Sequence, residues 1–410
     1  MSVKRNLVNA SVMIAAFTLL MIGFRDQAIA ASKTLDVGLV SNLGWSAGLD
    51  TANANQLIVD MDNKKGGLDI GGEKYQINLI VYDSNNVQAT EVAAINRLIY
   101  KDKVKYILSD GTFISTWLPE TEKNKIVVLA HHANFRETLN PELHYCFNPS
   151  CNDTKGAILT VWFCKKFPEK IKKMVIARPD NQIGHIVAEM ITGPMWRKFG
   201  ANVTDIFYPP ASQDLSVIGT KVKQLNPDTF MAEAGGASVD GLCFNAAYQA
   251  GYRGQIIGSL GTPTLTLLDV MSPEVAEGYI TGGSAVEFDP PSTQMAKDFK
   301  DAYIAKYGKW EGIEVHYGNF YACLRTALQK AGSIDPEEVA NTIADGLQFE
   351  SPGGPVKMIS RLDLGNERTV ESLATPTYIK QIKNGKTILF ESVDVDVALE
   401  YFHAAYPPMK

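Results

Sequence analysis

Short apolar runs alternate with helical stripes along the first part of the chain. Runs typical of buried strands occupy residues 35–40, 75–83, 105–110 and 126–132. Between these runs, apolar residues recur at helical spacing over 50–64 and 92–99, and a further helix is expected from about Ser115. This order of strands and helices predicts a parallel sheet that is covered by helices on both faces.

The same alternation begins again near Lys155. Strands are predicted at 173–180, 203–208, 229–234 and 255–258, and helices at 156–167, at 239–250, from His185 and from Asp214. Beyond Gly278 the pattern favours helices at 293–307, 315–331 and 336–345, and then strands at 377–382 and 387–392. We therefore expect the chain to return to the first α/β unit and then to the second, with several strands between the units forming a hinge.

The first 30 residues have the pattern of a cleavable secretory leader. Lys4 and Arg5 precede an apolar stretch at about 12–24, and residues 28–30 have the small-x-small pattern of a cleavage site. A membrane anchor is the weaker interpretation, because the stretch is shorter than the roughly 20 residues that span a bilayer. Loss of the leader removes three basic residues and one acidic residue, so the net charge of −6 becomes −8. An acidic exported protein is not expected to bind nucleic acid.

The cysteines leave the disulfide state open. Export permits disulfides, but an odd number of cysteines leaves at least one thiol free in a monomer. Cys146 and Cys151 could meet in one loop, although sequence alone assigns no pairing. The five cysteines are Cys146, Cys151, Cys164, Cys243 and Cys323.

Four loops combine glycine or short polar side chains with a position just after a predicted strand. They occupy residues 42–46, 109–115, 131–136 and 234–238. Ligands of open parallel sheets bind beyond the carboxyl ends of the strands, so these loops form the candidate binding site. Trp45 is expected to line the pocket, whereas Trp117 is expected in the core. Ordinary loop and cap chemistry is the alternative for any single loop.

Two motifs point to other chemistry. Residues 44–48 match the GxSxG motif, which would make Ser46 a hydrolase nucleophile. However, Ser46 follows the first strand of the mature chain, whereas a hydrolase needs an earlier strand to complete its oxyanion hole. His131 and His132 are adjacent, and adjacent side chains on a strand point to opposite faces, which disfavours a shared metal ion. We therefore expect no catalytic residue, no metal site and no cofactor.

A series of motifs resembles the type I periplasmic binding proteins of the Leu/Ile/Val-binding family, and the resemblance covers nearly all of residues 35–392. In chain order these motifs are DNKKGG at 62–67, VYDS at 81–84, YPP at 208–210, DLS at 214–216, KVK at 221–223, NPD at 226–228, AEG at 276–278, AYIAKYG at 302–308, ALQKAGS at 327–333 and GPV at 354–356.

The resemblance implies two Rossmann-like lobes with parallel sheets, joined by a three-strand hinge. One lobe would comprise residues 31–154 with 283–373, and the other 155–282 with 374–410. It further implies a monomeric periplasmic protein that closes around a small solute and delivers it to an ABC permease of the inner membrane. An extracytoplasmic sensor module with the same fold, and a secreted hydrolase that uses Ser46, remain as alternatives.

The resemblance also transfers the solute-binding positions of the family to particular residues of this chain. These residues are Thr112, Ser115, His132, Asn134, Ile183, Gly236, Ala237 and Leu260.

Three of these positions depart from the family pattern. Ile183 stands where the family usually has tyrosine, Gly236 or Ala237 where it has an aromatic residue, and Leu260 where it often has the acid that holds the ammonium of an amino acid. A buried ammonium needs such an acceptor, although Asp110, Glu233 or Glu314 could replace it. The sequence therefore predicts a solute that binds through a carboxylate or an amide, without a required ammonium, such as an aromatic or short-chain organic acid.

Overall fold

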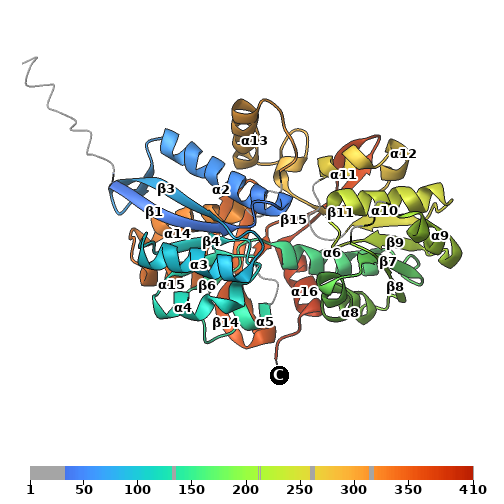
Figure 1. Cartoon of the computed structure of the whole chain (residues 1–410), viewed down its shortest axis with the longest axis horizontal. Helices are drawn as coiled ribbons and strands as arrows, with labels where there is room; N and C mark the ends of the chain where they lie inside the picture. The colour runs from blue at the N-terminus through green and yellow to red at the C-terminus, as the bar shows by residue number, and fades with distance from the viewer. Residues whose placement is uncertain are drawn as a thin grey trace, which may run out of the picture.

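The computed structural model describes residues 33–131, 135–210, 212, 214–258, 264–313 and 318–409. These residues form two α/β lobes that lie side by side in Figure 1. Each lobe is built on a largely parallel sheet with helices on both faces, as the alternating pattern predicted. Among the described residues, no helix combines the length and the apolar character that crossing a bilayer requires.

The first lobe contains a six-stranded sheet with the order β2-β3-β1-β4-β5-β6, in which only β2 pairs antiparallel to its neighbour. Its strands are β1 (Lys33–Ser41), β2 (Leu68–Ile70), β3 (Glu73–Asp83), β4 (Tyr106–Ser109), β5 (Val127–Ala130) and β6 (Cys146–Phe147). Its early helices are α2 (Ser46–Lys64), α3 (Gln88–Tyr100), the short η1 (Ile114–Thr116), α4 (Leu118–Lys123) and α5 (Phe135–Thr138).

After α2, Gly67 lets the chain pass close to β3. Gly67 adopts a φ of +85°, and a Cβ atom at this position would lie 2.3 Å from the carbonyl oxygen of Tyr75. The Asn63 side chain also bonds both backbone groups of Ile77 on β3. Together these contacts fix the angle at which the chain turns from helix to sheet.

The second lobe contains a seven-stranded sheet with the order β16-β15-β11-β10-β9-β7-β8. Its strands are β7 (Met174–Pro179), β8 (Val203–Tyr208), β9 (Thr229–Ala232), β10 (Gln255–Gly258), β11 (Ile280–Gly283), β15 (Thr377–Lys383) and β16 (Lys386–Val393). Its helices are α6 (Asn152–Lys166), α7 (Gln182–Ile186), η2 (Val187–Ile191), α8 (Thr192–Lys198), α9 (Ser216–Leu225), α10 (Ala237–Gln249), α11 (Thr264–Val270), α12 (Pro273–Ala276) and α16 (Val395–Ala405).

The late part of the chain adds helices and a third sheet. The helices are α13 (Gln294–Tyr307), α14 (Asn319–Ala331) and α15 (Pro336–Ala344), and short η turns occupy Ala285–Glu287 (η3) and Leu362–Leu364 (η5). The sheet is antiparallel, with the order β12 (Gln348–Ser351), β13 (Gly354–Arg361) and β14 (Asn366–Ala374).

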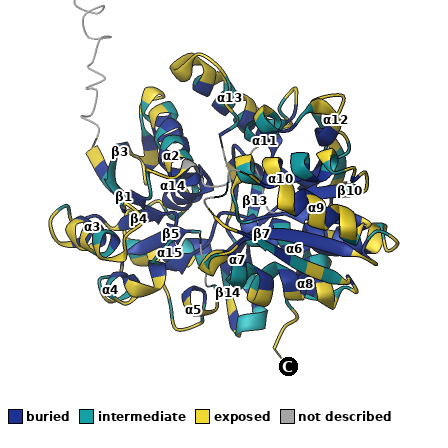
Figure 2. Ribbon diagram, turned by 45° about the vertical axis from the view of Figure 1, so that its right-hand side comes forward, coloured by how far each residue is buried: buried dark blue, intermediate teal, exposed yellow. Residues whose placement is uncertain are grey.

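The third sheet packs against both lobes because side chains alternate along its strands. Val356 and Met358 enter the core of the first lobe, whereas Ile359 and Leu373 join the core that α6 and α16 form in the second lobe. Figure 2 shows the resulting buried interior, with exposed residues on the outer helices.

The chain passes from the first lobe to the second after β6, returns to the first lobe and the third sheet after β11, and enters the second lobe again after β14. We call these connections the three crossings: residues 148–151, 284 and 375–376. They meet near the middle of the molecule, where α6 contacts β11, β14 and β15. A hinge between two parallel-sheet lobes is the architecture that the sequence predicted.

Candidate functional site

Loops at the carboxyl ends of the strands in the first lobe are tied together by a buried carboxylate. Asp110, which is 5% exposed, accepts hydrogen bonds from the Ser41 hydroxyl (2.8 Å) and from the Asn42 backbone N–H (2.7 Å). Its other oxygen accepts a bond from the Thr112 hydroxyl at 3.1 Å. Asp110 thus fixes the loops that follow β1 and β4, and its oxygens are already engaged by protein donors. Asp110 is therefore unsuited to the expected role of holding the ammonium group of a solute.

Gly111 brings the next loop into contact with this one. Its φ is +74°, and a Cβ atom here would lie 1.6 Å from the carbonyl oxygen of His131, after β5. Only glycine permits this approach. Thr112 is half-buried and Ser115 is exposed, so the predicted polar residues of this loop lie at the surface of the strand-end region.

Trp117 lies in the core, as the sequence predicted, whereas Trp45 lies at the surface of the first lobe. Trp45 precedes α2 and is 48% exposed, next to the loop that Asp110 holds. Trp117 is buried and donates its indole N–H to Glu91 at 2.7 Å. Burial raises the pKa of Glu91, and the hydrogen bond from Trp117 opposes that rise.

Ser46 is the first residue of α2, and its side chain lies outside the described part of the structure. Gly48 of the GxSxG motif has a packing role, because a Cβ atom there would lie 2.1 Å from the carbonyl oxygen of Asn42. Gly48 therefore permits a close contact between the helix and the loop before it.

In the second lobe, the loop after β9 approaches two buried polar atoms. A Cβ atom on Gly235 would lie 2.2 Å from the Tyr208 hydroxyl oxygen and 3.1 Å from Asp240 Oδ1. Neither of these atoms has a hydrogen-bond partner among the described residues. Burial, reinforced by the charge of Glu233, raises the pKa of Asp240 to about 8. Sequence analysis missed this pair, because Tyr208 and Asp240 are brought together only by the fold.

Gly236 and Ala237 lie where that loop meets α10. Gly236 has a φ of +84°, is exposed, and has open space around its Cβ position, whereas Ala237 is half-buried. The absence of an aromatic side chain at these two positions leaves room on the second lobe beside the strand ends.

Glu233 does not fit the role of an ammonium acceptor either. Arg178 donates from Nε to one oxygen of its carboxylate (2.8 Å), and Nη2 forms an ion pair with that oxygen at 2.6 Å. The Thr192 hydroxyl donates to the same oxygen. Arg178 also pairs with Asp205 on β8. Glu233 is therefore part of a buried ion network that joins β7, β8 and the end of β9.

Ile183 lies on α7 and is 44% exposed, beside a polar pair. His185 Nε2 lies 2.8 Å from Asp180 Oδ1, and the imidazole stacks on Phe207 with ring centroids 4.4 Å apart. The exposed isoleucine gives this edge of the second lobe an apolar surface where the family usually has tyrosine.

Three predicted site residues, His132, Asn134 and Leu260, lie outside the described part of the chain, as does Glu314. The five cysteines are buried, and the structure contains neither the Cys146–Cys151 disulfide nor another disulfide among them. Within the described residues, no group of histidine, cysteine and acidic side chains is arranged to hold a metal ion.

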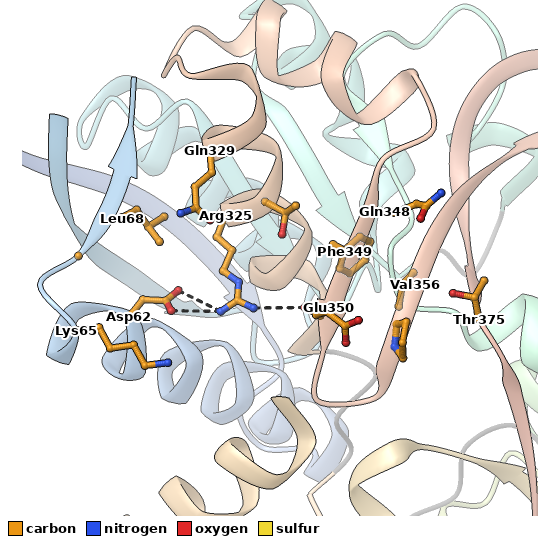
Figure 3. Close-up of a pocket in the computed structure, with 13 residues that line it drawn as sticks. Asp62, Lys65, Leu68, Arg325, Gln329, Gln348, Phe349, Glu350, Val356 and Thr375 are labelled. Carbon is orange, nitrogen blue, oxygen red and sulfur yellow. Dashed lines mark hydrogen bonds and ion pairs between the residues drawn. The ribbon is translucent and has the colours of Figure 1, made fainter. Parts of the chain in front are cut away.

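A separate cavity of about 540 Å³ lies between α2, α14 and the β12–β13 hairpin (Figure 3). Arg325 donates to Asp62 at 3.2 Å and to the carbonyl oxygen of Glu350 at 3.4 Å on its wall. None of the predicted site residues lines this cavity. It is lined by residues of the first lobe and by Thr375 of the third crossing.

Comparison with known proteins agrees with this architecture. A solute-binding protein of an ABC transporter from Rhodopseudomonas palustris, in complex with 3,4-dihydroxybenzoic acid, is 22% identical with a TM-score of 0.69, over 88% of this chain and 97% of that one. A leucine-binding protein from Thermotoga maritima is 19% identical with a TM-score of 0.67, over 88% of this chain and 99% of that one.

A branched-chain amino acid transporter substrate-binding protein from Streptococcus pneumoniae, in complex with isoleucine, gives the same identity, coverage and TM-score as the Thermotoga protein. The family model described as periplasmic binding protein matches residues 38–386 of this chain. The chain therefore belongs to the periplasmic binding protein family.

Proposed function

We propose that this protein is the solute-binding component of an ABC importer, and that it closes around a small solute in the periplasm. The observation that carries this proposal is the placement of loops at the carboxyl ends of two parallel sheets that the three crossings join. Loops 42–46 and 110–115 belong to one sheet, and loops 180–185 and 234–238 to the other. A solute held by both sets of loops stabilises the closed form through its higher affinity for that form.

The moving bodies are the lobes that the sequence predicts, residues 31–154 with 283–373 and residues 155–282 with 374–410. The closed protein then docks as a monomer on its permease in the inner membrane, after the leader at 1–30 has directed export. Neither step involves bond chemistry, so the protein acts without enzymatic activity. A sensor module would use the same closure and differ only in the receptor that reads it.

The solute is a small carboxylate or amide that needs no ammonium group. Two candidate acids, Asp110 and Glu233, are already engaged by protein donors, and position 260 is leucine. Solute-binding proteins of the same fold have been solved with 3,4-dihydroxybenzoic acid and with benzoate. Exposed Trp45 offers a face for an aromatic ring, and exposed Ile183 offers an apolar contact.

Ligand extracted from the native protein and identified by mass spectrometry tests the proposal, together with thermal shifts in panels of organic acids, amides and amino acids. Solute at 100 times its Kd should stabilise the protein by about 2.7 kcal/mol. A large shift with leucine and none with acids or amides contradicts the solute class. No shift and no bound solute contradicts the function, and ester turnover that Ser46→Ala abolishes would favour a hydrolase.

A further inference from the structure

A buried lysine occupies the place where the three crossings meet. Lys155 lies in the first turn of α6, directly after the first crossing, and is 3% exposed. Its Nζ donates to the hydroxyl of Ser284, in the second crossing, at 3.2 Å. In Figure 1, α6 begins near the middle of the molecule, between the two lobes. The ammonium group therefore lies at the hinge, where the crossings meet.

The nearby carboxylate is held by other groups. Glu287 accepts bonds at one oxygen from Lys380 on β15 and from the Thr264 hydroxyl (3.0 Å), and at the other from the Ser284 backbone N–H (2.7 Å). Among the described residues, the Ser284 hydroxyl is the only hydrogen-bond partner of Lys155 Nζ. Two buried lysines thus share the field of one carboxylate, and no acidic side chain in the described part of the chain contacts Lys155 Nζ directly.

This arrangement is costly for the protein without solute. Burial lowers the pKa of Lys155, and the charge of Lys380 lowers it further, although Cys151 and Glu287 oppose the shift. A buried charge normally has an opposite charge in contact, because its desolvation is otherwise uncompensated. An anionic solute bound at the hinge would supply that contact.

Unpartnered amide oxygens at the starts of α6 and α14 provide an independent observation. Asn152 lies one turn before Lys155 on α6, and Asn319 begins α14; both side chains are more than nine-tenths buried. The Oδ1 atoms of both have no hydrogen-bond partner among the described residues. Around Gly353, a Cβ atom would lie 3.6 Å from Asn319 Oδ1 and 3.9 Å from Ser284 Oγ, so these polar atoms belong to one cluster. Such oxygens require a donor, and leaving one unsatisfied costs about 1–3 kcal/mol.

We propose that Lys155 is a specificity-determining residue that contacts the anionic group of a small carboxylate solute at the hinge. The amide oxygens of Asn152 and Asn319 then accept hydrogen bonds from a hydroxyl or N–H group on the same solute. This assignment rests on the proposed function, because it uses the same cleft. It explains how the site holds a carboxylate although no acid remains to bind an ammonium.

The test compares acids with their neutral amides. Calorimetric titrations use benzoate, 3,4-dihydroxybenzoate and the two corresponding amides, with wild-type protein, Lys155→Met and Lys155→Gln. Glutamine keeps a hydrogen-bond donor for the Ser284 hydroxyl and removes the charge. Lys155→Gln therefore still tests the proposal if Lys155→Met does not fold. Lys165→Met is the matched control, because Lys165 lies on the same helix and pairs with Glu400 at the surface.

We expect the preference for acid over amide to fall at least tenfold in both Lys155 variants and to stay unchanged in Lys165→Met. The solute-free melting temperature should rise in Lys155→Gln, since a costly buried charge is removed; a purely structural lysine would lower it. Unchanged acid affinity in a folded Lys155 variant overturns the assignment and leaves the transport function intact. Failure of the wild-type protein to bind either acid overturns the carboxylate class together with the role of Lys155, and absence of every bound solute removes the proposed function itself.

Discussion

At the scale of single residues, the polar groups at the strand ends mainly hold the loops in place. Asp110 and Glu233 were candidates for solute contact from their positions in the sequence, but their carboxylates bond Ser41, Thr112 and Arg178. Position on a strand-end loop follows from the pattern of the sequence, whereas the direction of a side chain depends on residues far along the chain. The same limit applies to Lys155, which the sequence places only at the start of a helix.

The contact between Gly111 and His131 gives a residue-scale prediction. In Gly111→Ala, the added methyl group meets the His131 carbonyl oxygen at 1.6 Å while the backbone remains at a φ of +74°. The left-handed conformation alone costs about 1–2 kcal/mol, and the collision must also separate the two loops. We expect a lower melting temperature and at least a tenfold loss of solute affinity, measured by thermal denaturation and calorimetric titration.

Gly72→Ala is the matched control for this substitution. Gly72 has a φ of +85°, but no atom lies within 4 Å of its Cβ position. Gly72→Ala should lower the melting temperature through backbone strain and should retain wild-type solute affinity. Equal affinity in the Gly111 and Gly72 variants would show that the contact between the loops has no role in the site.

At the scale of elements, prediction succeeded where hydrophobic periodicity was strong and failed where short strands joined distant parts of the chain. The predicted strands at 173–180 and 255–258 are confirmed as β7 and β10. Strand β2 was missed because its three residues are too few to show an alternating pattern. The antiparallel sheet β12–β14 was recognised only at its 354–356 motif, because its strands contribute to the cores of both lobes and show no single apolar face.

Two helices also differ from the predictions. Helix α16 follows the last predicted strand and was not predicted, although Ala398, Phe402 and Ala405 form a buried stripe at helical spacing. The helix expected from His185 begins three residues earlier, at Gln182, because the Asn181 side chain caps it by accepting the Gly184 N–H. The sequence shows that Asn181 can cap a helix. It does not show whether the helix begins there or the preceding strand continues past this residue.

The ion network of Arg178 gives a prediction about how elements are held together. Arg178→Met leaves the carboxylate of Glu233 buried without its cation, and breaking a buried pair in this way costs about 3–5 kcal/mol. We expect a corresponding loss in the free energy of unfolding, measured by urea denaturation. The loop after β9 should become less ordered, because Glu233 precedes it directly.

Arg197→Met is the control, because Arg197 pairs with Asp205 of the same network but is 44% exposed. Exposed pairs contribute roughly 0–1 kcal/mol, so this variant should remain close to wild type. If both variants lost the same free energy of unfolding, burial of Arg178 would not explain how the network stabilises the fold.

At the scale of the whole molecule, the proposed contact at Lys155 would couple solute binding to movement through the hinge. The crossings carry Ser284 and lead directly into Lys155 and into β15 with Lys380, so a solute that contacts this cluster contacts the chain segments that must rotate when the lobes close. The strand-end loops on each lobe would then cover the remaining surface of the solute. The same contacts would therefore determine both the affinity for the solute and the closure of the lobes.

Trp45 provides the means to observe that closure. Among the tryptophans it is the exposed one, whereas Trp117, Trp162 and Trp196 are buried and Trp310 is half-buried against Tyr303. We expect solute to change the intrinsic fluorescence, and Trp45→Phe to remove most of that change. Loss of ring contact in Trp45→Ala should weaken binding by about 1 kcal/mol, which is roughly a fivefold rise in Kd.

Small-angle scattering completes the measurement, because closure of the lobes should lower the radius of gyration when solute is added. Trp310→Phe is the fluorescence control and should keep the wild-type response. A fluorescence change that survives in Trp45→Phe would place the solute away from the loop after β1. A radius of gyration that stays constant at saturating solute would mean that the lobes do not close, and the importer function would then lack its mechanism.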